Sequence, residues 1–466
     1  MKHTNENYMF EEMPIPKAVA SLAVPTIISS LVMVIYSMAD TYFVGMLNAP
    51  VQTAAVTLAA PVLLAFNAVN NLFGIGSSSM MSRALGRKDH ETIRHSSAFG
   101  FYGAIFCALM FSVFSLLFRS PLLQLLGTSE ETMAATNAYL TWTVTVGAVP
   151  AILNVVVAYM IRSEGGALNA SLGTMGGCLM NIVLDPIFIL PQFLNMGAAG
   201  AGLATCISNT CALLYFMTYL WIKRGKTHVC ISPKAFCLKK DIVLGVCAVG
   251  VPASIQNLLN VTGSTLLNNL ASPYGPAALA AMGICTKINM VPMYVALGLS
   301  QGIMPLVSYN YASGNIKRIK NTLRFSMTIS EGFLFLSSFV MFLGSSVIVQ
   351  LFIENPETVA YGSSFLKAFC LAQPVLGFDF LCVGVFQAVG MGRESLIFAI
   401  LRKIVFEIPF LVILNTLFPL YGLPYAQAGA ELLMAVIAGI VLVRFLTKAS
   451  VQAAVKAETK VDASVD

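Results

Sequence analysis

The chain has 466 residues, of which 57% are hydrophobic and only 10% are charged, and its mean hydropathy is +0.79. These values exclude an ordinary soluble globular protein and are typical of a protein that crosses a membrane many times. The net charge of +6 does not indicate a nucleic-acid partner, because the basic residues lie in short connections between apolar runs.

The first predicted helix covers residues 18–44 and is long enough to cross a bilayer. No cleavable signal peptide is expected, because the first sixteen residues are polar and the apolar run after Lys17 is too long for one. This helix contains Asp40. A charge within a membrane span is costly unless it is paired or hydrated, so Asp40 is a candidate functional residue.

Similar apolar runs follow along the whole chain and predict an all-α membrane protein. The twelve predicted spans cover residues 18–44, 53–80, 97–118, 137–161, 166–190, 200–222, 242–270, 276–306, 324–350, 362–389, 394–418 and 424–446. Alternate connections are rich in Lys and Arg, whereas the opposite connections carry Arg119 alone. By the positive-inside rule, the basic connections and both termini are expected in the cytoplasm of a multi-pass cell-membrane protein.

The sequence contains an internal repeat. VPTIISSL at 24–31 is echoed by VPASIQNL at 251–258, and the loops around Gly86 and Gly314 also correspond. A repeat of six helices keeps both halves in the same orientation, related by a pseudo-two-fold axis along the membrane normal. The expected organisation is an N-lobe (1–222), a cytoplasmic linker (223–241), a C-lobe (242–446) and a solvated cytoplasmic tail (447–466).

Two carboxylates of the first half are expected at the same depth. At 1.5 Å per helical residue, Asp40 and Asp185 both lie roughly 30 Å from the cytoplasmic face. Tyr36 and Asn181 are one helical turn from these acids and share their helix faces. No Lys or Arg lies within the first six predicted spans, and Arg162 stands at a cytoplasmic end, so each acid must be protonated or neutralised by a mobile cation such as Na⁺.

The second half carries more charges within or near its spans. Lys403 and Glu407 are four residues apart and are expected to form an ion pair. Lys287 and Asp379 are candidates for a substrate cavity, although Asp379 could instead have a partner on a neighbouring helix. The roles of Glu331, Glu407 and Glu431 stay open. The other candidate cavity residues are Met33, Asn67, Asn70, Gln256, Asn257, Asn260 and Met290.

Several other chemistries are not encoded. Gly225–Thr227 reads GKT, but the Walker loop needs a glycine where Leu220 stands. Most of the ten cysteines fall in apolar spans, and Cys230 and Cys237 lack the partners of a zinc site. No soluble domain that could hold an enzyme site is expected. These observations favour an ion-coupled secondary transporter over an enzyme, and a passive channel is a weaker alternative.

The chain resembles the multidrug and toxic compound extrusion (MATE) family, in its prokaryotic DinF/MepA-like branch. The resemblance covers almost the whole chain. It rests on VPTIISSL followed by Asp40 and TYFVG, SRALGRKD, RSEG at 162–165, NIVLDPIFI at 181–189, GIMPLVSYNYASG, and the stretch with Gln387, Gly390 and Gly392. It implies a V-shaped pair of six-helix lobes that open alternately to the two sides of the membrane.

The resemblance also implies a function: export of organic cations and amphipathic drugs in exchange for inward H⁺ or Na⁺, with no other cofactor. The coupling site implied by the family's motif contains Tyr36, Asp40, Tyr139, Asn181, Asp185 and Thr205, with Na⁺ as a possible ligand of Asp40, Asn181 and Asp185. A flippase or exporter of lipid-linked substrates is the alternative. Small drugs, the coupling ion and the bilayer are the expected partners, and a monomer is expected to suffice.

Overall fold

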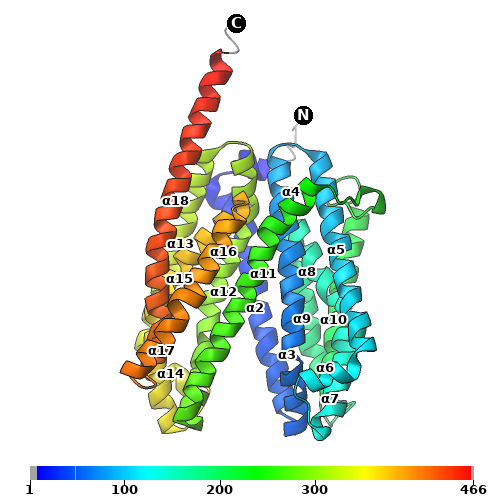
Figure 1. Cartoon of the computed structure of the whole chain (residues 1–466), viewed down its shortest axis with the longest axis vertical. Coiled ribbons are helices and arrows are strands. Elements are labelled where there is room, and N and C mark those ends of the chain that lie inside the picture. Colours follow the sequence, from blue (N-terminus) through cyan, green and yellow to red (C-terminus); the bar gives the residue numbers. More distant parts are fainter. Residues whose placement is uncertain (1–7, 48, 463–466) are drawn as a thin grey trace. The chain divides into compact units, whose positions relative to one another are not determined.

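The computed structural model describes residues 8–47 and 49–462, and the side chains among them as far as residue 452. The described residues form helices and connecting loops, without a β-strand (Figure 1). This confirms the all-α architecture that the apolar runs predict. In a bilayer a helix satisfies its own backbone hydrogen bonds, which is why such runs fold this way.

Helices α5 (His90–Leu117) and α7 (Glu130–Leu140) begin at capping side chains. The Asp89 side chain accepts a hydrogen bond from Thr92 N at the start of α5. The Ser129 side chain accepts one from Thr132 N at the start of α7. Two π-helical segments, η1 and η2, interrupt longer helical runs. The elements are α1 (Tyr8–Glu11), α2 (Ile15–Gly45), α3 (Pro50–Asn70), η1 (Asn71–Ile75), α4 (Gly76–Gly86), α5 (His90–Leu117), α6 (Arg119–Leu125), α7 (Glu130–Leu140), η2 (Thr141–Val146), α8 (Ala148–Ser163), α9 (Ala167–Ile189) and α10 (Ala198–Ile222).

The second part repeats this pattern. Asn315 and Asn355 cap α13 and α15, and Gly390 ends α15 in the left-handed conformation at φ 85°. A third π-helical segment, η5, lies within a longer run. The elements are η3 (Pro233–Ala235), α11 (Lys240–Ala271), η4 (Ser272–Tyr274), α12 (Pro276–Ala312), α13 (Ile316–Leu343), α14 (Ser345–Gln350), α15 (Pro356–Val389), α16 (Gly392–Ile400), η5 (Leu401–Glu407), α17 (Ile408–Leu417) and α18 (Gly422–Asp462).

Ten helices of the described chain are long and apolar enough to cross a membrane. An eleventh span is obtained if α7–η2 and α8, which meet at a bend of 50°, are counted together. The predicted span at 394–418 is the helical run α16–η5–α17, and three charged residues in its middle make it less apolar than the others. The chain is therefore a multi-pass membrane protein with ten or eleven clearly apolar spans and one charged helical run.

The predicted tail at 447–466 is helical over most of its length. Helix α18 continues to Asp462, well past the predicted end of the last span at residue 446, and residues 463–466 lie outside the described residues. The segment is rich in Ala and Lys and contains no Gly or Pro, so nothing in its sequence stops the helix.

The contacts divide the chain into two compact units, Ile28–Ser254 and Met1–Ile27 with Ile255–Asp466. Both boundaries fall inside the repeated motifs VPTIISSL and VPASIQNL, so α2 and α11 each belong partly to one unit and partly to the other. Glycines allow this packing. A Cβ on Gly302 of α12 would lie 2.6 Å from Ala23 Cα of α2, and one on Gly76 would lie 2.5 Å from the carbonyl oxygen of Val246 of α11. It stays a prediction that residues 1–222 and residues 242–446 form two lobes, each of which moves as one body.

Candidate functional site

Three helices of the unit Ile28–Ser254 bring most of the predicted coupling residues together. Asp40 and Tyr36 lie on α2, Tyr139 on α7, and Asn181 and Asp185 on α9. The Asp185 side chain is fully buried, at 0% exposure, and Asn181 and Tyr139 are also buried. Asp40 is half-buried. A buried carboxylate needs hydrogen-bond donors or a countercharge, so the surroundings of Asp185 decide the chemistry of the site.

The Asn181 amide connects α9 to α10. In the orientation that satisfies both of its polar atoms, Asn181 Nδ2 donates to Asp185 Oδ2 at 2.7 Å and Oδ1 accepts from Thr205 N at 3.1 Å. The Tyr36 hydroxyl is hydrogen-bonded to Thr205 as well. Thr205 is therefore the common contact of α2 and α9, and it links the helices that carry the two acids.

Among the described residues, no Lys or Arg forms an ion pair with the acids of this group. Asp40 interacts electrostatically with Asp185, and both acids act on Tyr36 and Tyr139. None of the ion pairs between described residues involves Asp40 or Asp185. Two acids that face each other without a cation cannot both stay ionised cheaply, so the site is suited to take up a proton or a cation.

The group offers oxygen atoms that could take up a proton or bind Na⁺. The group holds two carboxylates, and no set of three acidic, His or Cys side chains that could hold a metal is present in the described part of the chain. The Asn181 oxygen, a hard-cation ligand in principle, is already engaged by Thr205. Pro186 leaves the carbonyl of Ile182 without its usual helical donor, which makes this carbonyl one further oxygen that the sequence analysis did not consider.

The predicted substrate-cavity residues are divided between the two units. Met33 and Asn67 are exposed in the unit Ile28–Ser254, where Asn70 is buried with an unpaired Oδ1. Lys287 is exposed in the other unit, whereas Asp379 is buried. Gln256, Asn257, Asn260 and Met290 also belong to that second unit and are partly buried. A common substrate cavity for these residues stays a prediction.

A group of buried charges lies in the second unit. Lys403 Nζ lies 2.7 Å from Glu407 Oε1 and 2.6 Å from Glu407 Oε2, which confirms the ion pair expected from their spacing. Arg402 forms a second buried ion pair with Glu431 of α18 and lies over the Phe380 ring, 5.3 Å from its centroid. The sequence analysis did not find this pair, because the partners are 29 residues apart and no local spacing joins them.

Asp379 joins this group from α15. It is 3% exposed, lies against Glu431 and is acted on by Arg402 and Glu331, yet neither of its oxygens has a hydrogen bond from another described residue. Asp379 therefore lies among charged groups of neighbouring helices, and its predicted cavity role and the alternative of a partner there both stay predictions. Four acids (Glu331, Asp379, Glu407 and Glu431) share two cations (Arg402 and Lys403), so this group also has an excess of carboxylates.

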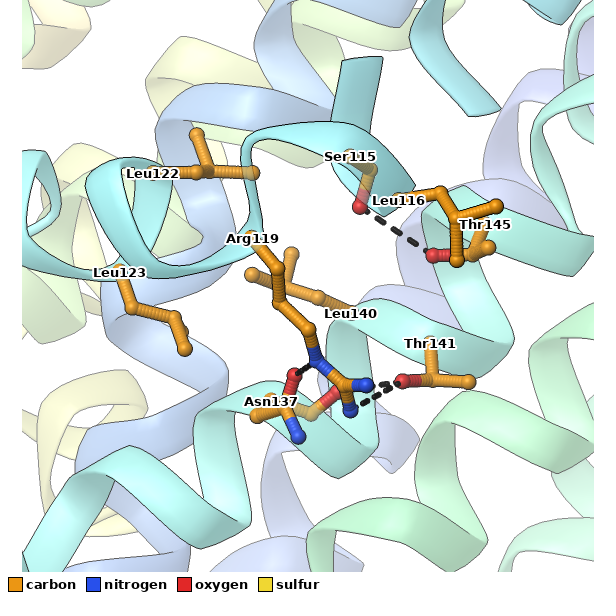
Figure 2. Close-up of a pocket in the computed structure, with 9 residues that line it drawn as sticks. All are labelled: Ser115, Leu116, Arg119, Leu122, Leu123, Asn137, Leu140, Thr141 and Thr145. Carbon is orange, nitrogen blue, oxygen red and sulfur yellow. Dashed lines mark hydrogen bonds between the residues drawn. The ribbon is translucent and has the colours of Figure 1, made fainter. Parts of the chain in front are cut away.

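Arg119, the basic residue of the opposite connections, has a structural role. Its guanidinium donates to Asn137 Oδ1 and, at 3.4 Å, to Thr141 Oγ1, and Ser115 and Thr145 are hydrogen-bonded beside it at 3.2 Å (Figure 2). The enclosed cavity is only about 40 Å³, too small for a drug-sized molecule. Arg119 thus joins the α5–α6 corner to α7 and η2.

Comparisons with known proteins agree with this architecture. The "Multidrug export protein MepA" of Staphylococcus aureus (strain MRSA252) is 32% identical over 436 residues, which cover 93% of this chain and 95% of the relative. The protein of the same name from Staphylococcus haemolyticus (strain JCSC1435) is 32% identical over 433 residues, 92% of this chain and 94% of the relative.

Solved structures show the same fold. A chain described as the "outward-facing conformation of a multidrug resistance MATE family transporter of the MOP superfamily" superposes with a TM-score of 0.90 at 24% identity, over 97% of this chain and 100% of that one. A point mutant of the Vibrio cholerae MATE transporter VcmN gives a TM-score of 0.87 at 20% identity, over 93% of this chain and 97% of that one. The MatE family model matches residues 25–187 and 252–413. The chain therefore belongs to the MatE family, whose members are membrane transporters and not enzymes.

Proposed function

We propose that this protein is a multidrug efflux antiporter of the cell membrane, which exports organic cations and amphipathic drugs in exchange for an inward cation. The family and the name of its curated relatives support export of drugs. The observation that carries the antiport mechanism is the pair Asp40 and Asp185, which lie together without a countercharge. A site that must be neutralised by something mobile is suited to couple the movement of a cation to that of a drug.

We propose H⁺ as the coupling ion, because protonation requires only the two carboxylates, whereas Na⁺ would need further oxygen ligands such as the Ile182 carbonyl. Protonation would remove the charge of the pair and weaken its attraction for a cationic drug. Transport then requires that the proton and the drug favour different states of alternating access, since a ligand with equal affinity for two states shifts neither. Both termini are proposed to be cytoplasmic, from the positive-inside rule. A monomer is proposed to be the working unit.

The experiment uses purified protein in proteoliposomes that contain ethidium and are given either a pH gradient or a Na⁺ gradient. We expect the pH gradient to drive transport by the wild type, and Asp40→Asn and Asp185→Asn to abolish it. Asp241→Asn is the matched control, because Asp241 is an exposed acid at the start of α11. Transport by the double variant Asp40→Asn/Asp185→Asn at the wild-type rate, with coupling kept, would refute the mechanism.

A flippase or exporter of lipid-linked substrates is the alternative function. A pyrophosphate-linked lipid would require several cations in the substrate cavity, and Lys287 is the one cation among the predicted cavity residues. If neither gradient moves ethidium while the protein stays folded, lipid-linked substrates become the better assignment.

A further inference from the structure

A cavity of about 770 Å³ opens in the unit Ile28–Ser254, where the start of α5 meets the end of α10 and the loop that follows it. Its polar wall is basic: Arg94, Arg224, His90 and His228 line it, and no carboxylate does. This volume is in the range of small-molecule sites. We name it the α5–α10 cavity.

The loop wall of this cavity is held in place by specific hydrogen bonds. Cys230 N donates to Ser97 Oγ at 2.9 Å, and the Tyr102 hydroxyl donates to Ile231 O at 2.8 Å. From the other side, His228 N donates to Glu164 Oε2 at 2.7 Å. Figure 1 shows this loop beside the upper part of α5. A wall fixed before binding avoids the entropic cost of ordering it on binding.

The acids nearest the cavity are already engaged. Asp89 binds Thr92 at the start of α5, Glu91 binds Lys239 at 2.8 Å, and Glu164 binds the loop. Arg94 and Arg224 form no ion pair with any described carboxylate. Both residues are exposed at the cavity, so it presents positive charge that the protein itself does not neutralise.

The face of α10 at this cavity is apolar over most of its length and ends in a cation. Leu214, Met217, Trp221 and Arg224 share one face of the helix through their spacing of three and four residues. Leu214 is 59% exposed and Trp221 is 74% exposed. Trp is enriched where a span meets the membrane surface. This face therefore has a cation at its end and apolar groups below it, which suits an anionic amphiphile.

The second unit also has a basic cavity. Lys317, Lys320 and Arg324 at the start of α13 line a cavity of about 440 Å³ with Ser450 of α18. The preceding Gly314 corresponds to Gly86, which precedes α5. Both units therefore have basic residues near the start of the helix that follows the corresponding glycine.

We propose that the α5–α10 cavity binds the phosphate headgroup of an anionic phospholipid from the adjoining leaflet. Arg94 and Arg224 bind the phosphate, and Trp221 and Leu214 contact the acyl chain. Arg is well suited to phosphate because its planar guanidinium can donate two parallel hydrogen bonds. Basic residues at the membrane surface attract anionic lipids in the same way. Soluble phosphate compounds offer the same headgroup chemistry without the acyl chain.

The test uses the full chain, delipidated in detergent and titrated with phosphatidylglycerol or phosphatidylcholine, with bound lipid counted by native mass spectrometry. Arg94→Gln/Arg224→Gln should weaken phosphatidylglycerol binding on the order of 30-fold, as expected for two surface cations. The matched control is Lys226→Gln/Lys234→Gln, which removes the same charge from exposed residues that do not line the cavity. Arg94→Lys/Arg224→Lys should bind better than the Gln variant.

Three results would overturn the proposal. The first is equal loss of binding in the Gln variant and the control, which would indicate non-specific attraction. The second is equal affinity for phosphatidylcholine. The third is displacement of phosphatidylglycerol by an equal concentration of glycerol 3-phosphate, which would make a soluble phosphate the ligand. The readout is lipid binding, so failure of the antiport mechanism would leave this test unaffected.

Discussion

Asn181 Nδ2 donates to Asp185 Oδ2 at 2.7 Å across one turn of α9, and the amide oxygen of the same residue accepts from α10. One side chain thus supplies a donor to the buried acid and fixes that acid relative to the next helix. The pairing follows from the spacing of the two residues, because side chains four residues apart on a helix share a face.

Asn181→Ala removes this donor while Asp185 stays buried. We expect ethidium transport in proteoliposomes to fall roughly tenfold to a hundredfold, the usual effect of removing a hydrogen bond to a buried charged group. Asn209→Ala is the control, because Asn209 accepts from Asn154 Nδ2 at 3.2 Å in the same unit without contacting either acid. An equal loss in both variants would show that the effect is general destabilisation.

The sequence predicts those parts of the structure that depend on local spacing. The apolar runs place the helices, the (i, i+4) rule finds Lys403 and Glu407, and a common depth groups Asp40 with Asp185. It does not predict the Arg402–Glu431 pair, because that contact depends on how distant helices pack.

The buried pair Lys403–Glu407 can be tested by a double-mutant cycle in detergent. Lys403→Met or Glu407→Leu alone leaves one buried charge without its partner and should lower the free energy of unfolding by about 3 kcal/mol. The double variant should recover most of this loss, because no unpaired charge remains. Additive losses would mean that the two charges contribute independently.

Neutralising Asp379 and neutralising Arg402 should have opposite effects on the thermal stability of the protein. Asp379→Asn removes one carboxylate from a group with an excess of acids, so the thermal midpoint of unfolding should stay the same or rise. Arg402→Met leaves Glu431 buried at 0% exposure without its cation and should lower the midpoint clearly. A lower midpoint for Asp379→Asn would show that this acid is ionised and paired in the folded protein.

Close helix packing through glycine gives a further prediction. A Cβ on Gly250 of α11 would clash with the backbone carbonyl of Leu72, an atom that cannot move aside easily. Gly250→Ala should therefore lower expression and thermal stability. Gly283→Ala on α12 is the matched control, since no atom lies within 4 Å of the added methyl group. Equal stability of the two variants would mean that α11 can shift away from η1.

Glu164 offers a prediction of pH dependence outside the spans. Its carboxylate accepts from the Thr227 hydroxyl at 2.7 Å and from His228 N, but burial outweighs these bonds and raises the pKa of Glu164 above its usual 4.5. A raised pKa means that the docked loop binds the proton more tightly than the undocked loop does. Docking is therefore most stable at low pH and weakens as the pH rises through the pKa of the docked state.

Hydrogen exchange at residues 227–231, corrected for the intrinsic rate at each pH, measures this docking. Wild-type protection should fall as the pH is raised from the ordinary glutamate pKa of about 4.5 towards neutrality. Glu164→Gln keeps an acceptor for His228 N but cannot ionise, so its protection should be independent of pH. Glu164→Ala removes the acceptor and should lose protection at every pH. If Glu164→Gln keeps the wild-type pH dependence, a group other than Glu164 controls the docking of the loop.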